Sequence, residues 1–485
     1  MTSTPDPDCG CRHTLTNEAG EEFTIIHQMP KALSHYYPLP DLATGVIPLY
    51  RGKFQTDGKR YRGVISLSLD PRPTVDVSGV RNVTIEDIMA LDGSRGSAKW
   101  VDRPTVAVDV KEVPKPPKTP HLRWSRKAGT ERRSWDPAPI DVGSGPVDEI
   151  TFFVLNGWLA FDGLNTCYDG HDRPGRVQIG LGEWELRIEP RGDHAPKVVR
   201  DHSRGRGQSA VTHVGRIRRL DGVDFEPLDA VGVLEVVETL VSFALGRVTS
   251  VALPVGMLNG KPVWTRWSAL RAVDRPLGST PWLDASRAAA QLAELFQCGH
   301  AASLDALKWE VFQRTLGYYF SANFEATVTM KVMLPVSGLL MLSFAYFVET
   351  LPPGDPARLS KKAWKALTAE EAIRLLLDRM AADTAVPGHL AHLVGVQSKL
   401  ATAANPAPDG LSCVVKMRND VAHPERARLA RWDTYEWAEA GFVAMGFFDA
   451  AMLWWLDYQG RYIPRSAKHR SAGDAVDVPW GSGTS

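Results

Sequence analysis

The chain has 485 residues, of which 44% are hydrophobic and 23% are charged, and its 56 basic side chains balance 56 acidic ones. The apolar fraction is near the globular average and excludes a largely disordered chain. Zero formal net charge excludes a protein that holds nucleic acid by a broad cationic surface, so any nucleic-acid partner must meet a local site. Five cysteines are too few for the disulfide framework of a small secreted protein, and a polar N-terminus without an apolar run predicts no signal peptide. We therefore expect a cytoplasmic protein.

The first half of the chain is predicted to form mostly antiparallel β-structure. Apolar and polar residues alternate over residues 61–69, 149–155 and 183–188, with Gly, Pro, Asp and Asn clusters between them. Residues 113–139 combine proline with basic residues, which favours an extended loop or linker that would divide the β region in two. Residues 191–208, rich in Gly and charge, are predicted to be irregular as well.

A helix and a hairpin are predicted to follow. Residues 229–246 carry apolar side chains at helical spacing and end on Gly246. Strands at 249–254 and 263–267 are joined through Asn259-Gly260, a pair typical of tight hairpin turns. The segment GMLNGK resembles a phosphate-binding loop only superficially, because its spacing is wrong and Pro262 stands where Ser or Thr is required. We expect a turn there.

After Trp282 the pattern becomes helical, which predicts an α+β fold: a β-rich N-terminal region (1–284), a helical bundle (285–465) and a disordered polar tail (466–485). The apolar run Val332–Val348 contains Pro335 and falls short of the roughly 20 apolar residues that a membrane span needs. It is predicted to be a buried core helix, with membrane attachment as the alternative. The expected helices have helix-period apolar residues and cover 284–296, 304–320, 327–351, 369–382, 390–404 and 432–458.

The stretch VVKMRNDVAHPE, residues 414–425, is the most informative for chemistry. Pro424 cannot continue a helix normally and biases His423 away from the α region, so the motif is predicted to lie where a helix is interrupted. Such a break can bring Arg418 and His423 together, although five residues of ideal helix would separate them by about 140°.

These side chains suit cleavage of an RNA phosphodiester by the ribose 2′-hydroxyl. His423 has a pKa near neutrality and can move the proton, while Arg418 can hold the phosphate oxygens with two parallel hydrogen bonds and no metal. Asn419 can orient either residue or contact the phosphate. Because one histidine cannot be base and acid in a single step, we expect a homodimer with facing motifs, or a water in place of the second histidine.

The segment Arg418-Asn419-Asp420-Val421-Ala422-His423 matches the R-N-x-x-x-H form of the R-x4-6-H motif of HEPN domains, which are small helical bundles found in toxins and antiviral ribonucleases. The apolar helix after it and the Gly460-Arg461-Tyr462 and Arg465 that close it resemble bacterial HEPN proteins of the ApeA-like anti-phage group. The N-terminal region distantly resembles their sensor-type domain. This resemblance implies a metal-independent, homodimeric endoribonuclease acting in anti-phage defence by growth arrest, with tRNA among the candidate substrates and a phage-derived trigger at the N-terminal region.

An acidic residue on an earlier helix often accompanies the motif in such domains. Glu349 is the candidate, with Glu325 behind it, and the alternative for Glu349 is a solvated helix end. For Arg418 and His423 themselves the alternative is a surface ion pair and a capping residue, in a bundle that only dimerises.

Two basic segments are candidates for binding RNA, because cations interleaved with aromatic rings permit phosphate contact and base stacking. Solvated loops are the alternative for both. The first segment comprises Lys115, Lys118, Arg123, Trp124, Arg126, Lys127, Arg132 and Arg133; the second comprises Arg200, Arg204, Arg206, Arg216, Arg218 and Arg219.

No metal and no cofactor are expected. Cys9, Cys11 and His13 lack a second group of ligands at zinc-site spacing, and they lie in an N-terminal segment that we expect to be flexible. Isolated pairs such as Cys167 with His171 and Cys298 with His300 predict no site, and His389 and His392 are expected to pack. No hydrolase, ATPase or dehydrogenase motif occurs in a fitting context. The prediction is thus a cytoplasmic endoribonuclease, and the alternative is a non-catalytic protein that senses a ligand or binds a nucleotide.

Overall fold

A computed structural model of the chain shows two compact units. The first unit consists of residues 1–160, 164–238 and 249–276, and the second of residues 161–163, 239–248 and 277–485. The boundary falls inside helix α3 (Val231–Leu245), between Glu238 and Thr239. The structure describes residues 8–16, 22–33, 46–56, 59–69, 73–82, 105–106, 130–137, 140–157, 162–169, 171–193, 197–198, 201, 209–268, 270–271, 273–274, 281–324, 327–422 and 431–481.

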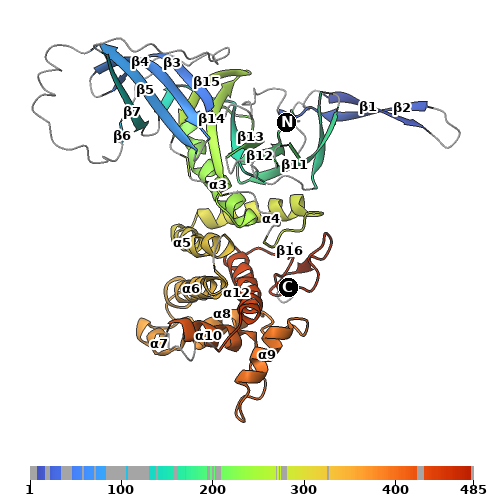
Figure 1. The fold of residues 1–485 in the computed structure, drawn as a ribbon. Coiled ribbons are helices and arrows are strands. Elements are labelled where there is room, and N and C mark those ends of the chain that lie inside the picture. Colours follow the sequence, from blue (N-terminus) through green and yellow to red (C-terminus); the bar gives the residue numbers. More distant parts are fainter. Residues whose placement is uncertain are drawn as a thin grey trace, which may run out of the picture. The chain divides into compact units, whose positions relative to one another are not determined.

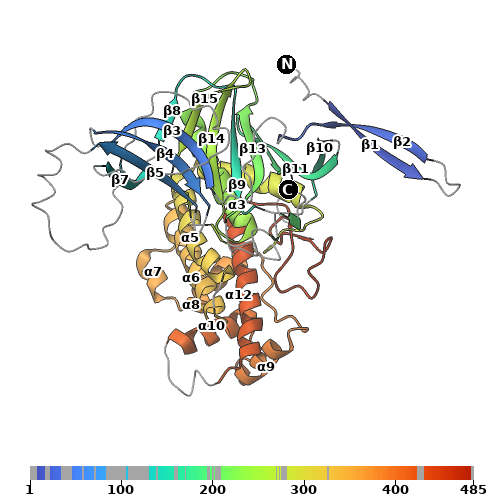
Figure 2. The same cartoon turned by 45° about the horizontal axis from the view of Figure 1, so that its top comes forward.

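Antiparallel sheets build the first unit (Figures 1 and 2). Eight strands follow the order β10-β11-β12-β13-β9-β14-β15-β8, five follow the order β3-β4-β5-β7-β6, and β1 pairs with β2. The short pairing of β6 with β7 is parallel. The strands are β1 (Asp8–Thr16), β2 (Glu22–Pro30), β3 (Val46–Thr56), β4 (Lys59–Ser68), β5 (Thr74–Asn82), β6 (Thr105–Val106), β7 (Thr130–Pro137), β8 (Ile140–Gly143), β9 (Glu149–Leu155), β10 (Leu164–Tyr168), β11 (His171–Leu181), β12 (Trp184–Pro190), β13 (Val211–Arg219), β14 (Ser250–Leu258) and β15 (Lys261–Trp267).

The strands predicted from alternation are confirmed as β4, β9 and β12. On β12, Trp184, Leu186 and Ile188 point to one face and Glu185, Arg187 and Glu189 to the other, because successive side chains of a strand alternate. The predicted hairpin turn is also confirmed: Asn259 and Gly260 both have positive φ, 50° and 72°, which suits the tight turn between β14 and β15. A core cluster joins β4, β9 and β15 through side chains that include Ile65, Leu67, Leu155 and Trp267.

Two expectations for the first unit are corrected. Residues 113–139 were predicted to form a linker, but Thr130–Pro137 is strand β7, paired with β5 over six residues from Val77↔Trp135 to Asn82↔Thr130. The Cys9 segment was predicted to be floppy, but it forms strand β1, paired with β2 along its whole length. Strand β7 pairs with a segment about fifty positions earlier, which local composition does not record, whereas β1 pairs with the next strand of the chain.

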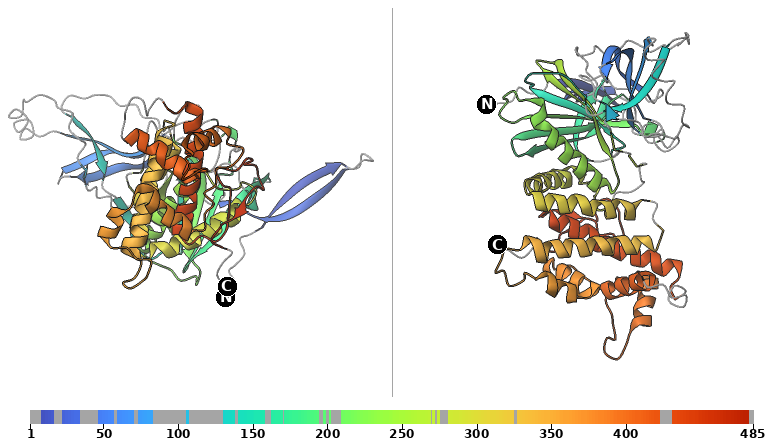
Figure 3. Two further views of the ribbon diagram at one scale, coloured as in Figure 1. Left: turned by 90° about the horizontal axis from the view of Figure 1, so that it is seen from below. Right: turned by 90° about the vertical axis from the view of Figure 1, so that its left-hand side faces the viewer.

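The second unit is a bundle of helices, seen as the yellow to red helices stacked in layers in Figure 3. The longest, α12, packs against α5, α6, α8, α9 and α10. The structure thus confirms the α+β class, with strands before helices. The elements are α4 (Ala288–Ser303), α5 (Ala306–Asn323), α6 (Met330–Phe344), a π-helical turn η3 (Ala345–Thr350), α7 (Lys361–Ala366), α8 (Ala369–Arg379), α9 (Ala391–Leu400), α10 (Gly410–Ala422), α12 (Thr434–Trp455) and the strand pair β16 (Arg461–Tyr462) and β17 (Val476–Asp477).

Side-chain caps explain where several of these helices begin. Thr368 and Glu371 form a capping box at the start of α8, and Asp433 and Glu436 form one at the start of α12. Inside the bundle a chain of aromatic rings links helices: Phe243 contacts Trp282, Phe312 and Tyr319, and Tyr319 contacts Phe448 at 5.5 Å between ring centroids. Such contacts bury large apolar areas and fix ring geometry.

The apolar stretch from Met330 to Thr350 is long and apolar enough to cross a membrane by length and composition alone. In the bundle its side chains Val332, Val336, Leu339 and Leu342 are fully buried against neighbouring helices, as predicted for a core helix.

The expected disordered tail is corrected for residues 466–481. Val476 and Asp477 pair with β16, and Ala475 and Val478 are buried. The Gly473 amide also donates to Asp284 at 2.9 Å. The polar, Gly-rich composition thus predicted disorder for a segment that packs on the bundle.

Candidate active site at the end of helix α10

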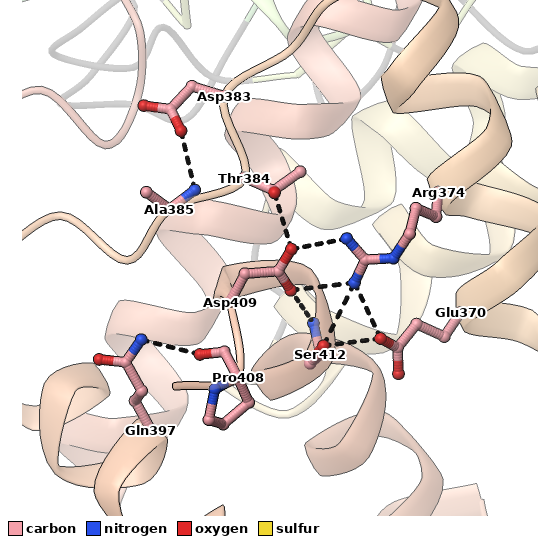
Figure 4. A network of polar contacts seen from close by, with 9 residues as sticks. All are labelled: Glu370, Arg374, Asp383, Thr384, Ala385, Gln397, Pro408, Asp409 and Ser412. Carbon is pink, nitrogen blue, oxygen red and sulfur yellow. Dashed lines mark hydrogen bonds and ion pairs between the residues drawn. The ribbon is translucent and has the colours of Figure 1, made fainter. Parts of the chain in front are cut away.

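Helix α10 carries the first five residues of the predicted catalytic motif, Arg418 to Ala422, and a polar network fixes the first turn of this helix (Figure 4). Asp409 precedes the helix, and its carboxylate accepts from the Ser412 amide at 2.9 Å, the contact of an N-cap. Arg374 of α8 binds both carboxylate oxygens, at 2.7 and 3.1 Å, and Thr384 donates to one of them at 2.7 Å. Figure 4 shows Arg374 lying between Asp409 and Glu370, with which it also pairs at 2.9 Å.

This network changes the ionisation of its members. Burial raises the pKa of Asp409, but the hydrogen bonds from Arg374, Ser412 and Thr384 outweigh that effect and hold the pKa well below its usual range. The carboxylate is therefore charged at neutral pH, and its pairing with the forked guanidinium is geometrically specific. The consequence is a firm connection between α8 and the start of α10.

A second network secures the other end of α10. Asp420 is buried, and its two oxygens accept from Lys416 Nζ at 2.9 Å and from Trp432 Nε1 at 2.9 Å. The Trp432 ring is in turn covered by Arg431, whose guanidinium carbon lies 4.6 Å from the ring centroid, and by Lys399 at 5.7 Å. The last turn of α10 is thus tied to the residues that lead into α12.

Arg418 lies between these two polar networks. It is two residues before Asp420, so on an ideal helix the two side chains point about 160° apart. Its side chain is half-buried, and its Nη1 donates to Asn419 Oδ1 at 3.0 Å. Its Nε is buried and has no hydrogen-bond partner among the residues that the structure describes. The arrangement restrains the guanidinium at one nitrogen and leaves donors for an anion such as a phosphate.

The remaining predicted residues are placed only in part. His423 and Glu325 lie outside the described residues. Glu349 is exposed on the π-helical turn η3, and within the described ranges no hydrogen bond or ion pair connects it to Arg418 or Asn419. The structure therefore joins Arg418 to Asn419 and leaves Glu349 apart from both.

In the two predicted RNA-binding segments, the basic residues that the structure describes belong to strands and not to loops. Residues Lys115, Lys118, Arg123, Trp124, Arg126 and Lys127 lie outside the described residues, whereas Arg132 and Arg133 belong to strand β7. In the second segment, β13 carries the last three arginines. Arg218 pairs with Glu185 at 2.9 Å, Arg219 pairs with Asp221 at 2.6 Å, and Arg216 is buried beside Glu185.

Sequence reasoning missed a buried triad that joins α5, α12 and the C-terminal segment. Asp449 is fully buried, accepts from the Tyr319 hydroxyl at 2.6 Å and from Arg465 Nε at 2.5 Å and Nη2 at 3.0 Å. Burial, with the Asp449 charge beside it, raises the pKa of Tyr319 well above its ordinary value. Tyr319 and Asp449 are 130 positions apart, so the local signal was limited to an acidic residue in the apolar second half of α12.

The cysteines and histidines give two further findings. Cys167 is disulfide-bonded, while Cys298 and Cys413 are free thiols. This differs from the reduced state expected for Cys167. His392 stacks on Tyr435 with ring centroids 5.0 Å apart, the packing role expected for it. No group of three or more His, Cys, Asp or Glu side chains in the described ranges is arranged to hold a metal ion.

Comparisons with known proteins follow the two units. Residues 143–278 match the YopA central domain, and residues 305–477 match the YopA C-terminal domain. The chain is 22% identical over 306 residues to the SPbeta prophage-derived uncharacterized protein YopA of Bacillus subtilis (strain 168). That alignment covers 63% of this chain and 66% of the relative, slightly under two thirds of its length. No solved structure matches the chain. These matches name no activity, so the ribonuclease interpretation stays a prediction.

Proposed function

We propose that the chain is a HEPN-type endoribonuclease whose active site forms where α10 ends. The observation that carries the proposal is the Arg418 guanidinium: it is half-buried, restrained by Asn419, and has a buried Nε without a described partner. Five positions later comes His423, whose neutral-range pKa suits proton transfer. The polar networks at both ends of α10, around Asp409 and Asp420, support the precise positioning that phosphoryl chemistry requires.

In the proposed reaction the ribose 2′-oxygen attacks the adjacent phosphorus. His423 accepts the 2′-hydroxyl proton, Arg418 stabilises the charge that develops on the non-bridging oxygens, and the bond from phosphorus to the 5′-oxygen breaks. His423 of the partner subunit, or a water, returns a proton to that oxygen. The products are a 2′,3′-cyclic phosphate and a 5′-hydroxyl, and the proposed oligomer is a homodimer.

Cleavage of total RNA and of tRNA in EDTA tests the proposal. Wild-type protein should produce the two named end groups, and His423→Ala should lose at least about 100-fold of the rate, the usual cost of removing a general base. His392→Ala is the matched control, because His392 lies in the same unit and stacks on Tyr435. Cleavage that persists in His423→Ala would remove this residue from the mechanism.

A biological role in anti-phage defence, by RNA cleavage that arrests growth, belongs to the same proposal. The similar protein of Bacillus subtilis is named as prophage-derived, which connects that relative with phage biology. Growth arrest on expression of the wild type, and its absence with His423→Ala, is the expected result. Wild-type protein that leaves both growth and RNA intact, even with a phage trigger present, would favour the alternative, a non-catalytic ligand-sensing or nucleotide-binding protein.

A cytoplasmic location is also proposed, and the disulfide at Cys167 makes it testable. Disulfides are rare in reducing compartments. Alkylation of thiols in intact cells followed by mass spectrometry reports the state of Cys167. A free thiol there fits the cytoplasm, and a disulfide in cells would argue for an oxidising compartment.

A further inference from the structure

A cavity of about 400 Å³ opens in the first unit, and no step of the proposed reaction uses it. Its size falls in the range of small-molecule sites. All residues that line it belong to this unit. Its walls come from the first half of α3, from β14 and β15, and from the segment after β15, and they include Leu234, Glu238, Pro254, Arg266, Leu270 and Arg271.

Two guanidinium groups and two carboxylates line the cavity, and one of the carboxylates, Glu235, is exposed to solvent. Arg271 Nε donates to Glu238 Oε1 at 2.8 Å, and in the described ranges its terminal nitrogens bind no protein group. The second oxygen of Glu238 is already occupied by the Ser250 hydroxyl at 2.9 Å and the Val251 amide at 2.8 Å. Glu238 therefore holds Arg271 in place and has no oxygen left unbound, so the fork of Arg271 faces the cavity ready for an anion.

Arg266 adds a second cation whose own pairing is weak. Its Nη1 lies 3.8 Å from an oxygen of Asp141, beyond hydrogen-bond distance, and this is its one ion pair among the described residues. Its side chain is mostly shielded from solvent. A half-buried guanidinium without a close carboxylate gains most from an anionic ligand, since screening by water is reduced there.

The rest of the lining combines aliphatic side chains with the polar Glu235, Ser250 and Ser268. Leu234 and Pro254 are buried and Leu270 is half-buried. No aromatic ring is among the described lining residues, so a nucleobase would find no surface for stacking. The aliphatic side chains offer contact to a hydrocarbon group, and the lack of rings among the described lining residues disfavours a nucleotide.

Backbone strain marks the same wall. Leu253 has φ of 51°, a left-handed conformation that is costly for a bulky side chain, and the register of β14 with β9 shifts between Ala252 and Val255. Pro254, which lines the cavity, lies within this irregular stretch. Bulges that redirect a strand beside a ligand site are common.

We propose that this cavity binds a small aliphatic anion, with its carboxylate or phosphate on Arg266 and Arg271 and its hydrocarbon part against Leu234, Pro254 and Leu270. The proposal stands independently of the ribonuclease proposal, because it concerns the first unit alone. It assigns that unit a ligand class.

Isothermal titration of the full chain with three eight-carbon probes below their critical micelle concentrations tests it. Octanoate or octyl phosphate should bind with one site per chain, and the stronger of the two identifies the anion as carboxylate or phosphate. Octylamine, which has the same hydrocarbon part and the opposite charge, should bind at least tenfold more weakly. Absence of binding by both anions, or equal binding of octylamine, would overturn the proposal.

Variants locate the binding. Arg271→Gln and Arg266→Gln should each weaken the anion at least tenfold, whereas Arg219→Gln, which removes an arginine paired with Asp221 elsewhere in the unit, should leave it unchanged. Arg271 is 49% exposed and Arg266 only 22%, so Arg271→Gln should disturb the fold less and carries the test even if Arg266→Gln does not fold. Unaltered affinity in Arg271→Gln would place the ligand elsewhere and refute the assignment.

Discussion

Asp449→Asn is expected to destabilise the helical unit strongly. The wild-type carboxylate is fully buried and neutralises Arg465, whose side chain is 13% exposed, while also accepting from the Tyr319 hydroxyl. Asparagine has nearly the same shape, and its amide oxygen can still accept one hydrogen bond. The charge is lost, however, and the Arg465 guanidinium remains in a site largely removed from water.

The size of the effect follows from this geometry. Removing one partner of a buried ion pair costs about 3–5 kcal/mol, because the other charge stays buried and unpaired. Tyr319→Phe removes only one neutral donor and should cost about 1 kcal/mol. Arg465→Met in the Asp449→Asn background removes the orphaned charge, so the double variant should regain stability relative to Asp449→Asn alone.

Urea unfolding followed by circular dichroism in the helical band measures these differences, because helices are concentrated in the second unit. The ranking expected is wild type, Tyr319→Phe, the double variant and then Asp449→Asn. A loss below about 1 kcal/mol for Asp449→Asn would refute the reasoning, since it would mean that Arg465 finds solvent or another partner at little cost. A double variant less stable than Asp449→Asn would refute the unpaired-charge explanation in particular.

Three further results are expected. Because Asp409 has a lowered pKa, its stabilising contribution is complete above its unfolded pKa of about 4 and is lost as pH falls through the lower folded value, so Asp409→Asn should flatten acid unfolding curves; an unchanged curve would contradict this. Gly338→Ala places a Cβ 2.3 Å from Phe448 Cζ and should cost about 1–3 kcal/mol in urea unfolding, whereas Gly395→Ala, with open space at its Cβ, should cost nothing. Arg418→Lys keeps the charge without the fork, and RNA cleavage should fall roughly 100-fold; an undiminished rate would show that bidentate binding is unnecessary.

Elements with a strong internal period were predictable from the sequence because the period is a local property. The predicted helix at 229–246 is α3 (Val231–Leu245), and the predicted strand at 183–188 is β12 (Trp184–Pro190). The turn at Asn259-Gly260 was predictable for a similar reason, since two adjacent residues with positive φ are rarely formed by other pairs.

What could not be predicted depends on partners distant in the chain. Strand β7 is basic and looks like a linker until β5 supplies its pairing partner, some fifty positions earlier. The C-terminal segment after Ser466 looks disordered until Arg470 and Gly473 bond to Pro281 and Asp284. In both cases the stabilising contacts are non-local, and neither composition nor period encodes them.

In the candidate site, too, the motif was predictable from the sequence and the contacts that support it were not. The spacing of Arg418 and His423 is visible in the sequence, but the groups that orient α10 are not: Arg374 acts from α8 on Asp409, and Trp432 acts on Asp420 from beyond the end of the helix. If the motif matched only by chance, nothing would require charged, directional bonds at both ends of its helix. Equally, such bonds would stabilise a bundle that only dimerises. Among the described residues the buried Nε of Arg418 has no partner, which costs free energy in a purely structural helix, and the ribonuclease proposal predicts that a bound phosphate satisfies this donor.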